Sequence, residues 1–189
     1  MASVLVLLAE GCEETEAVTL IDLLRRAGVE VVTAGLERGP VVASRGVTLQ
    51  PDRLLDEVIE RDFDMLVLPG GGGGADRLRR DPRVLELIRR HAGGGRWSAA
   101  ICAAPRVLAD AGVLQGHRAT SFPGWLDGVP DIDYAEDSVV VDGRVATSRG
   151  PGTAMDFGLQ LVELLMGREA AVAVEEKLQR PAAHRRYAG

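Results

Sequence analysis

The feature that most constrains the fold of this chain is the alternation of short apolar runs with longer segments of helical period. Val4–Ala9 is a continuous apolar run and Glu14–Ala27 is amphipathic. Gly28, a residue that commonly ends helices, then precedes a second apolar run, Val29–Ala34. This is the pattern of a βαβ unit. Because later segments repeat it, the sequence predicts a doubly wound, mostly parallel α/β sheet with helices on both faces, in a single domain over residues 1–189.

The rest of the chain supplies further elements of both kinds. Further strands are expected at Met65–Leu68, Ser98–Ile101, Ala119–Phe122, Val139–Val141 and Val145–Thr147. Further helices are expected at Pro82–Ala92, Pro105–Ala111, Thr153–Met166 and Arg168–Leu178. Asp142-Gly143 between two of these strands is typical of a hairpin turn, so we expect one antiparallel pair in the sheet.

Composition excludes several functional classes. The 22 basic and 28 acidic residues leave a net charge of −6, so no overall positive field attracts nucleic acid. The N-terminal apolar run has no basic flank and reads as a buried strand rather than a signal peptide, and no apolar run approaches the roughly 20 residues of a membrane helix. Two cysteines are too few for a disulfide framework. We therefore expect a cytoplasmic protein.

Ligands of open α/β sheets bind beyond the carboxyl ends of the strands, so the residues that follow each strand are where chemistry is expected. Four such segments stand out: Gly11–Glu16, Pro69–Gly74, Cys102–Pro105 and Ser148–Thr153.

Cys102 lies at a predicted strand-to-helix turn. Such a turn, a nucleophile elbow, needs small residues two positions before and after the nucleophile, and Ala100 and Ala104 meet that need. Pro105 suits the first helical turn. Because a helix N-terminus favours a thiolate, we expect Cys102 to have a lowered pKa and to be reactive. The alternative is a buried structural cysteine.

Glu16 is the candidate partner of this cysteine. Its spacing from Leu20, Leu23 and Leu24 places its carboxyl on the apolar stripe of the first helix. A buried acid tends to stay protonated or to find a partner, and a protonated carboxyl donates a hydrogen bond to a thiolate. The alternative for Glu16 is an ordinary first-turn acid that complements the helix dipole, which is our interpretation of Glu13 and Glu14.

The glycine run Gly70–Gly74 follows a strand but lacks the Lys-Ser/Thr ending of a phosphate-binding P-loop. Its backbone N–H groups are candidates for an anion nest that holds an oxyanion or an oxidised sulfur. A flexible surface loop is the alternative.

Four segments in the correct order carry a resemblance that covers nearly the whole chain. They are Glu13–Val18, Leu68–Gly71, Ala99–Pro105 and Thr147–Thr153. Together they resemble the ThiJ/PfpI superfamily, in the branch of the Parkinsonism-associated protein deglycase ("DJ-one") and its bacterial counterpart YajL.

The resemblance implies a flavodoxin-like fold, a homodimer and a cytoplasmic protein of the oxidative and carbonyl stress response. It implies that Cys102 is the nucleophilic, oxidisable cysteine and that Glu16 is its protonated partner. The N–H groups of Gly71 and Ala103 would form the oxyanion site, and Arg45 would reach the pocket of the neighbouring subunit. The residues expected at the oxyanion and substrate site are Gly70, Gly71, Ala103, Arg45, Phe122, Arg149 and Pro151.

The chain also departs from related sequences. Phe122 stands where animal members carry a histidine, which argues against a mechanism that needs that imidazole, and Ala103 replaces the histidine of protease-like members. Cys12, on the same predicted rim as Cys102, is a candidate resolving thiol. The three histidines, His91, His117 and His184, are predicted to lie on the surface.

Two functions of different classes fit these residues. In the first, the Cys102 thiolate attacks glyoxal, methylglyoxal or their early adducts on proteins and nucleotides, and Glu16 acts as general acid and then as base. The product from methylglyoxal is lactate, and no metal or organic cofactor is expected. In the second, oxidation of Cys102 to a sulfinic acid makes the protein a redox sensor and chaperone with little turnover. A third hypothesis, a cysteine peptidase or amidase, requires an imidazole beside the sulfur.

Overall fold

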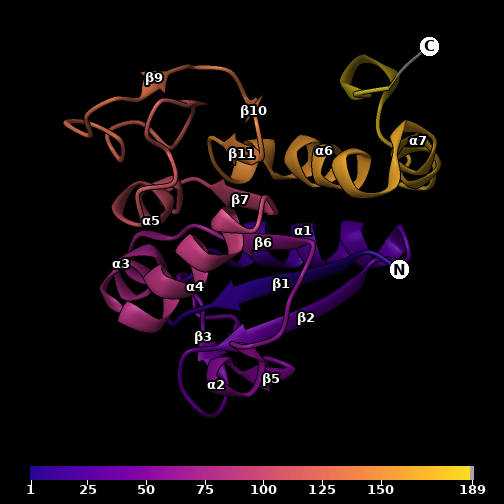
Figure 1. Cartoon of the computed structure of the whole chain (residues 1–189). Coiled ribbons are helices and arrows are strands. Elements are labelled where there is room, and N and C mark those ends of the chain that lie inside the picture. The colour runs from indigo at the N-terminus through magenta and orange to yellow at the C-terminus, as the bar shows by residue number, and fades with distance from the viewer. Residues whose placement is uncertain (188–189) are drawn as a thin grey trace.

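The computed structural model describes residues 1–187, and these build a seven-stranded sheet with helices on both faces (Figure 1). The order of the strands is β10-β11-β7-β6-β1-β2-β5. Neighbouring strands are parallel except for the pair of β10 and β11, which is antiparallel. The predicted doubly wound, mostly parallel sheet and its hairpin are therefore confirmed.

The predicted apolar runs agree with strands of the structure to within a residue or two, with one exception described below, whereas the short strands β3, β4, β5 and β9 were not predicted. The main sheet contains β1 (Ser3–Leu8), β2 (Glu30–Gly35), β5 (Arg53–Leu54), β6 (Met65–Leu68), β7 (Trp97–Ile101), β10 (Val139–Asp142) and β11 (Val145–Ser148). Two short pairs lie outside it: β3 (Val41–Val42) with β4 (Thr48–Leu49), and β8 (Arg118–Ala119) with β9 (Asp133–Tyr134).

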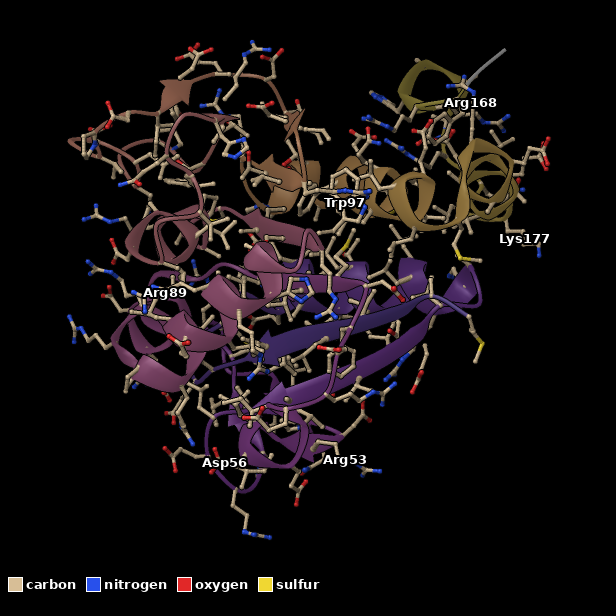
Figure 2. All side chains as sticks on the ribbon, in the orientation of Figure 1. Arg53, Asp56, Arg89, Trp97, Arg168 and Lys177 are labelled. Carbon is tan, nitrogen blue, oxygen red and sulfur yellow. The ribbon has the colours of Figure 1, made fainter. Side chains whose placement is uncertain are left out.

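The helices form one layer on each face of the sheet. On one face α1 (Glu14–Arg26) packs against α6 (Ala154–Met166), which contacts α7 (Arg168–Lys177). The other layer is built from α3 (Gly72–Arg80), α4 (Pro82–Gly93) and α5 (Pro105–Asp110). Short elements complete the fold: α2 (Leu55–Val58) and the 3-10 turns Pro151–Thr153 and Ala182–His184. Charged side chains project from the surface all around the molecule (Figure 2).

The core lies at the centre of the sheet. Val4, Leu5, Val6 and Leu7 of β1 and all four residues of β6 have no exposed surface, because helices cover both faces of these strands. Strands buried on both sides need apolar residues at every position, which is why they appear in the sequence as unbroken apolar runs.

One prediction about local structure is wrong. The run Ala119–Phe122 is not a strand of the main sheet: only Arg118–Ala119 form β8, and beyond it Phe122 N donates to Cys102 O at 2.9 Å. For the glycine run, the alternative of a flexible surface loop does not hold, because α3 begins at Gly72 within it. Among residues 1–187, no helix is long and apolar enough to cross a bilayer.

Candidate active site

Cys102 follows β7 at the predicted sharp turn into α5. Its φ is +64°, a left-handed conformation that non-glycine residues rarely adopt and that costs of order 1–3 kcal/mol. Both of its backbone groups are bonded: Cys102 N donates to Ser148 O and its carbonyl accepts from Phe122 N, each at 2.9 Å. Ala100 and Ala104 are completely buried beside the turn. The predicted sharp strand-to-helix turn is therefore present, and bonds to neighbouring segments hold its strained conformation.

Two backbone N–H groups interact with the Cys102 sulfur. They belong to Gly71, at the start of α3, and Ala103, the next residue after the cysteine, and both stabilise the charged form of the sulfur. The sulfur and the Gly71 donor come from segments about thirty residues apart in the chain, which the parallel pairing of β6 with β7 brings to one edge of the sheet. These are the two N–H groups that the family resemblance implies for an oxyanion site.

Glu16 meets the cysteine from the opposite helical layer. Its side chain is fully buried on α1, as its place on the apolar stripe predicts. Oε2 accepts a 2.7 Å hydrogen bond from Gly70 N, while Oε1 is buried without a nitrogen or oxygen partner among the described residues. The carboxyl also interacts with the Cys102 side chain. Acid and thiol therefore share one enclosed site.

Glycine is required where α3 approaches this pair. A β-carbon at Gly70 would lie 2.5 Å from Cys102 Cβ, 2.6 Å from Glu16 Oε2 and 2.8 Å from Ile101 O. Gly71 has a φ of +87°, and a β-carbon there would lie 2.6 Å from Glu13 N. The absence of side chains at Gly70 and Gly71 thus lets the acid, the thiol and the N–H donors lie close together.

The protonation of the pair differs from the sequence prediction. Burial raises the pKa of Glu16 to about 7. Hydrogen bonds with Gly70 N–H and Cys102 act in the opposite direction but are smaller than the effect of burial. Burial also raises the pKa of Cys102 to about 12, and the charge of an ionised Glu16 adds to the rise. The predicted low thiol pKa is therefore wrong: next to a Glu16 carboxylate the sulfur keeps its proton, because two negative charges in one buried site repel.

The two acids that precede Glu16 have separate structural roles. Glu13 caps α1 by accepting a 2.7 Å bond from Glu16 N, as expected of a first-turn acid. Glu14 does more than complement the helix dipole: it is buried and accepts bonds from Ser44 Oγ at 2.9 Å and Arg45 N at 2.8 Å. Burial opposes its ionisation, but these and other backbone hydrogen bonds outweigh it and lower the pKa of Glu14.

The other predicted substrate residues lie around the elbow or away from it. Phe122 is half-exposed and its ring packs over Gly150, where a β-carbon would be 3.5 Å from Cδ2. Arg149 points its Nη1 at Glu136 O, 2.9 Å away, and Pro151 is exposed at the start of a 3-10 turn. Arg45 is exposed, with Nη1 3.3 Å from Ser44 O. The roles of these four residues toward a substrate stay predictions.

The histidines are not part of this site. The predicted surface position of His91 is wrong: it is buried, and its Nε2 donates to Trp97 O at 2.8 Å, at the opposite end of the strand that leads to Cys102. His117 is partly buried and lies 3.2 Å from Asp142 Oδ2 near the hairpin turn, whereas His184 is exposed as predicted. A peptidase that depends on a Cys-His pair finds no support in this arrangement.

Cys12 is buried in the loop between β1 and α1. Burial and the charge of Glu14 raise the pKa of its thiol to about 11. It packs against the glycine run, since a β-carbon at Gly74 would lie 2.8 Å from its Cα. A resolving role for Cys12 stays a hypothesis.

Known proteins share both the sequence and the fold of this chain. The protein dj-1beta of Drosophila melanogaster is 45% identical over 179 residues, which cover 93% of this chain and 96% of the fly protein. The Parkinson disease protein 7 homolog of Danio rerio is 42% identical over 92% of this chain and 95% of its own. A protein of Caenorhabditis elegans named glutathione-independent glyoxalase DJR-1.2 is 38% identical over 88% of this chain and 90% of its own.

Solved structures agree with these relatives. The crystal structure of the Drosophila dj-1beta protein superposes with a TM-score of 0.92 at 43% identity, covering 95% of this chain and 98% of that one. The structure of oxidised DJ-1 from Toxoplasma gondii gives a TM-score of 0.91 at 39% identity, over 94% and 98% of the two chains. The predicted flavodoxin-like fold is therefore confirmed. The family model described as the DJ-1/PfpI family matches residues 2–164, and the chain belongs to that family.

Proposed function

We propose that this protein is a cofactor-independent, cysteine-dependent glyoxalase that converts methylglyoxal and glyoxal to hydroxy acids. One observation carries the proposal: the Cys102 sulfur interacts with two backbone N–H groups and with a buried carboxyl whose pKa is raised to about 7. Such a set can deliver a nucleophile, hold an oxyanion and move a proton at neutral pH. The name of the worm relative, a glutathione-independent glyoxalase, supports the same class of reaction.

In the first step the sulfur adds to the aldehyde carbon. The S–C bond forms as the thiol proton passes to the Glu16 carboxylate, and the carbonyl oxygen becomes an oxyanion held by the N–H groups of Gly71 and Ala103. Since the thiol is protonated beside an ionised Glu16, this residue acts first as a base, the reverse of the order expected from the sequence.

In the following steps the substrate is oxidised at one carbon and reduced at the next. Glu16 donates its proton to the oxyanion, takes up the proton of the former aldehyde carbon and delivers it to the neighbouring carbonyl carbon through an enediol. In the same rearrangement the hydroxyl proton on the first oxygen moves to the oxygen of the neighbouring carbonyl, so the first carbon becomes a carbonyl and the second an alcohol. The result is a thioester on Cys102. Water then attacks the thioester, releases lactate from methylglyoxal and returns a proton to the sulfur, so atoms and charge balance without an external oxidant.

The same first attack extends the proposal to early glycation adducts on proteins and nucleotides, where the leaving group is the amine. Phe122 and Pro151 are exposed, and in this proposal they are the residues that a larger substrate contacts. A decisive comparison is the release of lactate from a methylglyoxal-treated peptide after all free methylglyoxal has been removed.

A redox sensor is the second candidate. The same two N–H groups and the Glu16 carboxyl can stabilise a sulfinate on Cys102. The raised thiol pKa argues for slow oxidation, because peroxide reacts with the thiolate. Mass spectrometry of Cys102 during exposure to peroxide, alongside turnover on methylglyoxal, separates the two functions.

The test is lactate production from methylglyoxal without glutathione, by the wild type and by Cys102→Ser and Glu16→Asp. We expect loss of activity in Cys102→Ser and a strong reduction in kcat in Glu16→Asp, with unchanged circular dichroism. Activity that survives in Cys102→Ser would remove the thiol from the mechanism. Negligible turnover in the wild type, with clean sulfinate formation, would favour the sensor.

We also propose that the protein is a cytoplasmic homodimer. Val18, on the outer face of α1, is 48% exposed, and Ile21 on the same helix is partly exposed. Burial of this apolar face in a second copy would place the nearby Arg45 loop at the partner. Light scattering of the wild type and of Val18→Glu tests the dimer, and a monomer in both would contradict it.

A further inference from the structure

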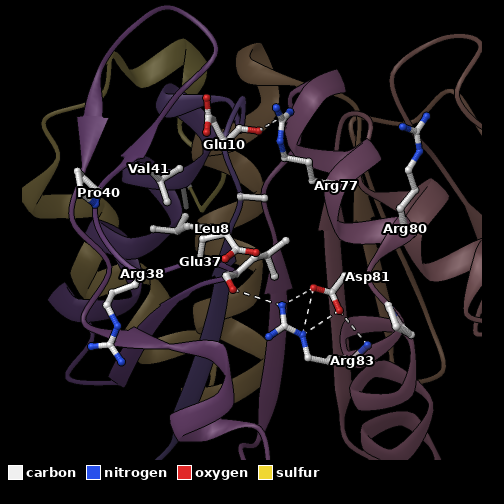
Figure 3. Close-up of a pocket in the computed structure, with 13 residues that line it drawn as sticks. Leu8, Glu10, Glu37, Arg38, Pro40, Val41, Arg77, Arg80, Asp81 and Arg83 are labelled. Carbon is white, nitrogen blue, oxygen red and sulfur yellow. Dashed lines mark hydrogen bonds and ion pairs between the residues drawn. The ribbon is translucent and has the colours of Figure 1, made fainter.

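A cavity of about 620 Å³ lies apart from the Cys102 site, at the carboxyl ends of β1 and β2. Its walls come from the segment after β2 on one side and from the junction of α3 and α4 on the other (Figure 3). Its volume falls within the range of small-molecule sites, and the carboxyl edge of an open α/β sheet is where such sites form.

The floor of the cavity is apolar. Leu8 at the end of β1, Leu36 after β2 and Val41 in β3 line it, and each has less than a tenth of its surface exposed. Figure 3 shows Leu8 between Pro40 and Val41 on one side and Arg77 on the other. An apolar group that enters the cavity therefore meets packed side chains.

Four arginines line this cavity, and they differ in whether a carboxylate neutralises them. Arg83 is bonded to Asp81 at 2.6 Å and to Asp56 at 2.8 Å, so its charge is balanced. Arg79 stands between Arg77 and Arg80 in the sequence but is not part of the cavity lining. It pairs with Asp110 at 2.6 Å.

Arg77 and Arg80 have no carboxylate within 4 Å in the part of the chain that the structure describes. Three residues apart on α3, they share one side of the helix, at the cavity. Arg77 is held in place by two carbonyls, Glu10 O at 3.1 Å and Gly73 O at 3.2 Å, which orient its guanidinium without cancelling its charge. The guanidinium of Arg80 makes no hydrogen bond or ion pair within residues 1–187.

The remaining charges of the lining are Arg38 and the carboxylates of Glu10 and Glu37. With the Asp81–Arg83 pair balanced, three arginines face two acids, so the cavity keeps a positive excess in a protein whose net charge is −6. A local excess against the overall charge favours an anionic ligand.

From this arrangement we propose a second ligand site, for a small organic anion whose apolar body rests on Leu8 and Val41 and whose charged group is bound by Arg77 and Arg80. Guanidinium groups recognise both carboxylates and phosphate esters. The site is separate from Cys102 and does not depend on the proposed glyoxalase reaction.

The proposal is tested by nuclear magnetic resonance titration of the full chain with phenyl phosphate, benzoate, inorganic phosphate and benzyl alcohol. We expect phenyl phosphate or benzoate to shift backbone amides of Glu37, Val41 and Arg77, and to bind at least tenfold more tightly than inorganic phosphate and benzyl alcohol. The stronger of the two aromatic anions identifies the charged group as phosphate or carboxylate.

Arg80→Gln is the informative variant, because this side chain has no internal partner to lose among the described residues. It should weaken binding of the aromatic anion about tenfold, and Arg77→Gln should do the same. The matched control is Arg89→Gln, on the exposed surface of α4 (Figure 2) and 3.8 Å from Glu86, which should leave binding unchanged. Equal affinity in wild type and Arg80→Gln, shifts confined to Cys102 and Phe122, or equal affinity for inorganic phosphate would each overturn the proposal.

Discussion

Replacement of Glu16 by glutamine measures how the titration of the buried carboxyl contributes to the free energy of unfolding. The side chain has no exposed surface, and its pKa rises from 4.5 to about 7 on folding. Between these two values the native state holds a proton that the unfolded chain has lost. The contribution of Glu16 to stability is therefore most favourable below about pH 4.5 and becomes less favourable as the pH rises through 7, by about 3 kcal/mol in total, since one pKa unit corresponds to about 1.4 kcal/mol.

Glutamine keeps the shape of the side chain and an oxygen for Gly70 N–H but does not ionise. Urea unfolding of the wild type and Glu16→Gln should therefore be compared between about pH 4.5 and about pH 8. We expect the variant to gain about 3 kcal/mol relative to the wild type across that window. Glu86→Gln, on the exposed face of α4, is the control and should show no such trend. A difference between Glu16→Gln and wild type that does not change with pH would refute the reasoning.

Three further predictions follow from the same contacts. In Gly70→Ala the new methyl meets Cys102 Cβ at 2.5 Å, so we expect a loss of about 1–3 kcal/mol in urea unfolding and of lactate production, whereas Gly93→Ala, where nothing lies within 4 Å, should keep both. Iodoacetamide labelling of Cys102 should accelerate with pH without a plateau below about pH 9, and Glu16→Gln should shift this profile to lower pH by removing a negative charge; a plateau near neutral pH in the wild type would contradict the raised pKa. Leu66→Ala, in the fully buried β6, should cost about 2–5 kcal/mol in the same unfolding assay, and a loss below about 1 kcal/mol would show that the core relaxes around the change.

Local sequence patterns were sufficient to locate most of the fold. Strands such as β1 and β6 are recognisable because both of their faces are covered, which demands apolar residues throughout. The α1 helix is recognisable from its period, and the place of Glu16 on its apolar stripe is enough to predict a buried acid. The elbow at Cys102 is visible in its flanking alanines because steric crowding of the turn is a local effect.

Other features depended on contacts that local patterns do not contain. Gly72–Gly74 are poor helix formers, yet α3 begins there, where Gly73 and Gly74 pack against the loop that carries Cys12 and Gly72 against Trp125. The role of Glu14 depends on hydrogen bonds from Ser44 and Arg45, about thirty residues further along the chain. His91 is buried where its ring can bond to the carbonyl of Trp97, in the next strand.

By itself, the sequence located the residues of the candidate site: a thiol at a strained turn, an acid on an apolar helix face and glycines after a central strand. Only the tertiary structure decided how their protons are shared. Burial and the distance between two ionisable groups set their pKa values, and both arise when α1, α3 and β7 meet at one edge of the sheet. The pKa of the Cys102 thiol is raised there, first because burial disfavours the thiolate and second because an ionised Glu16 lies beside it.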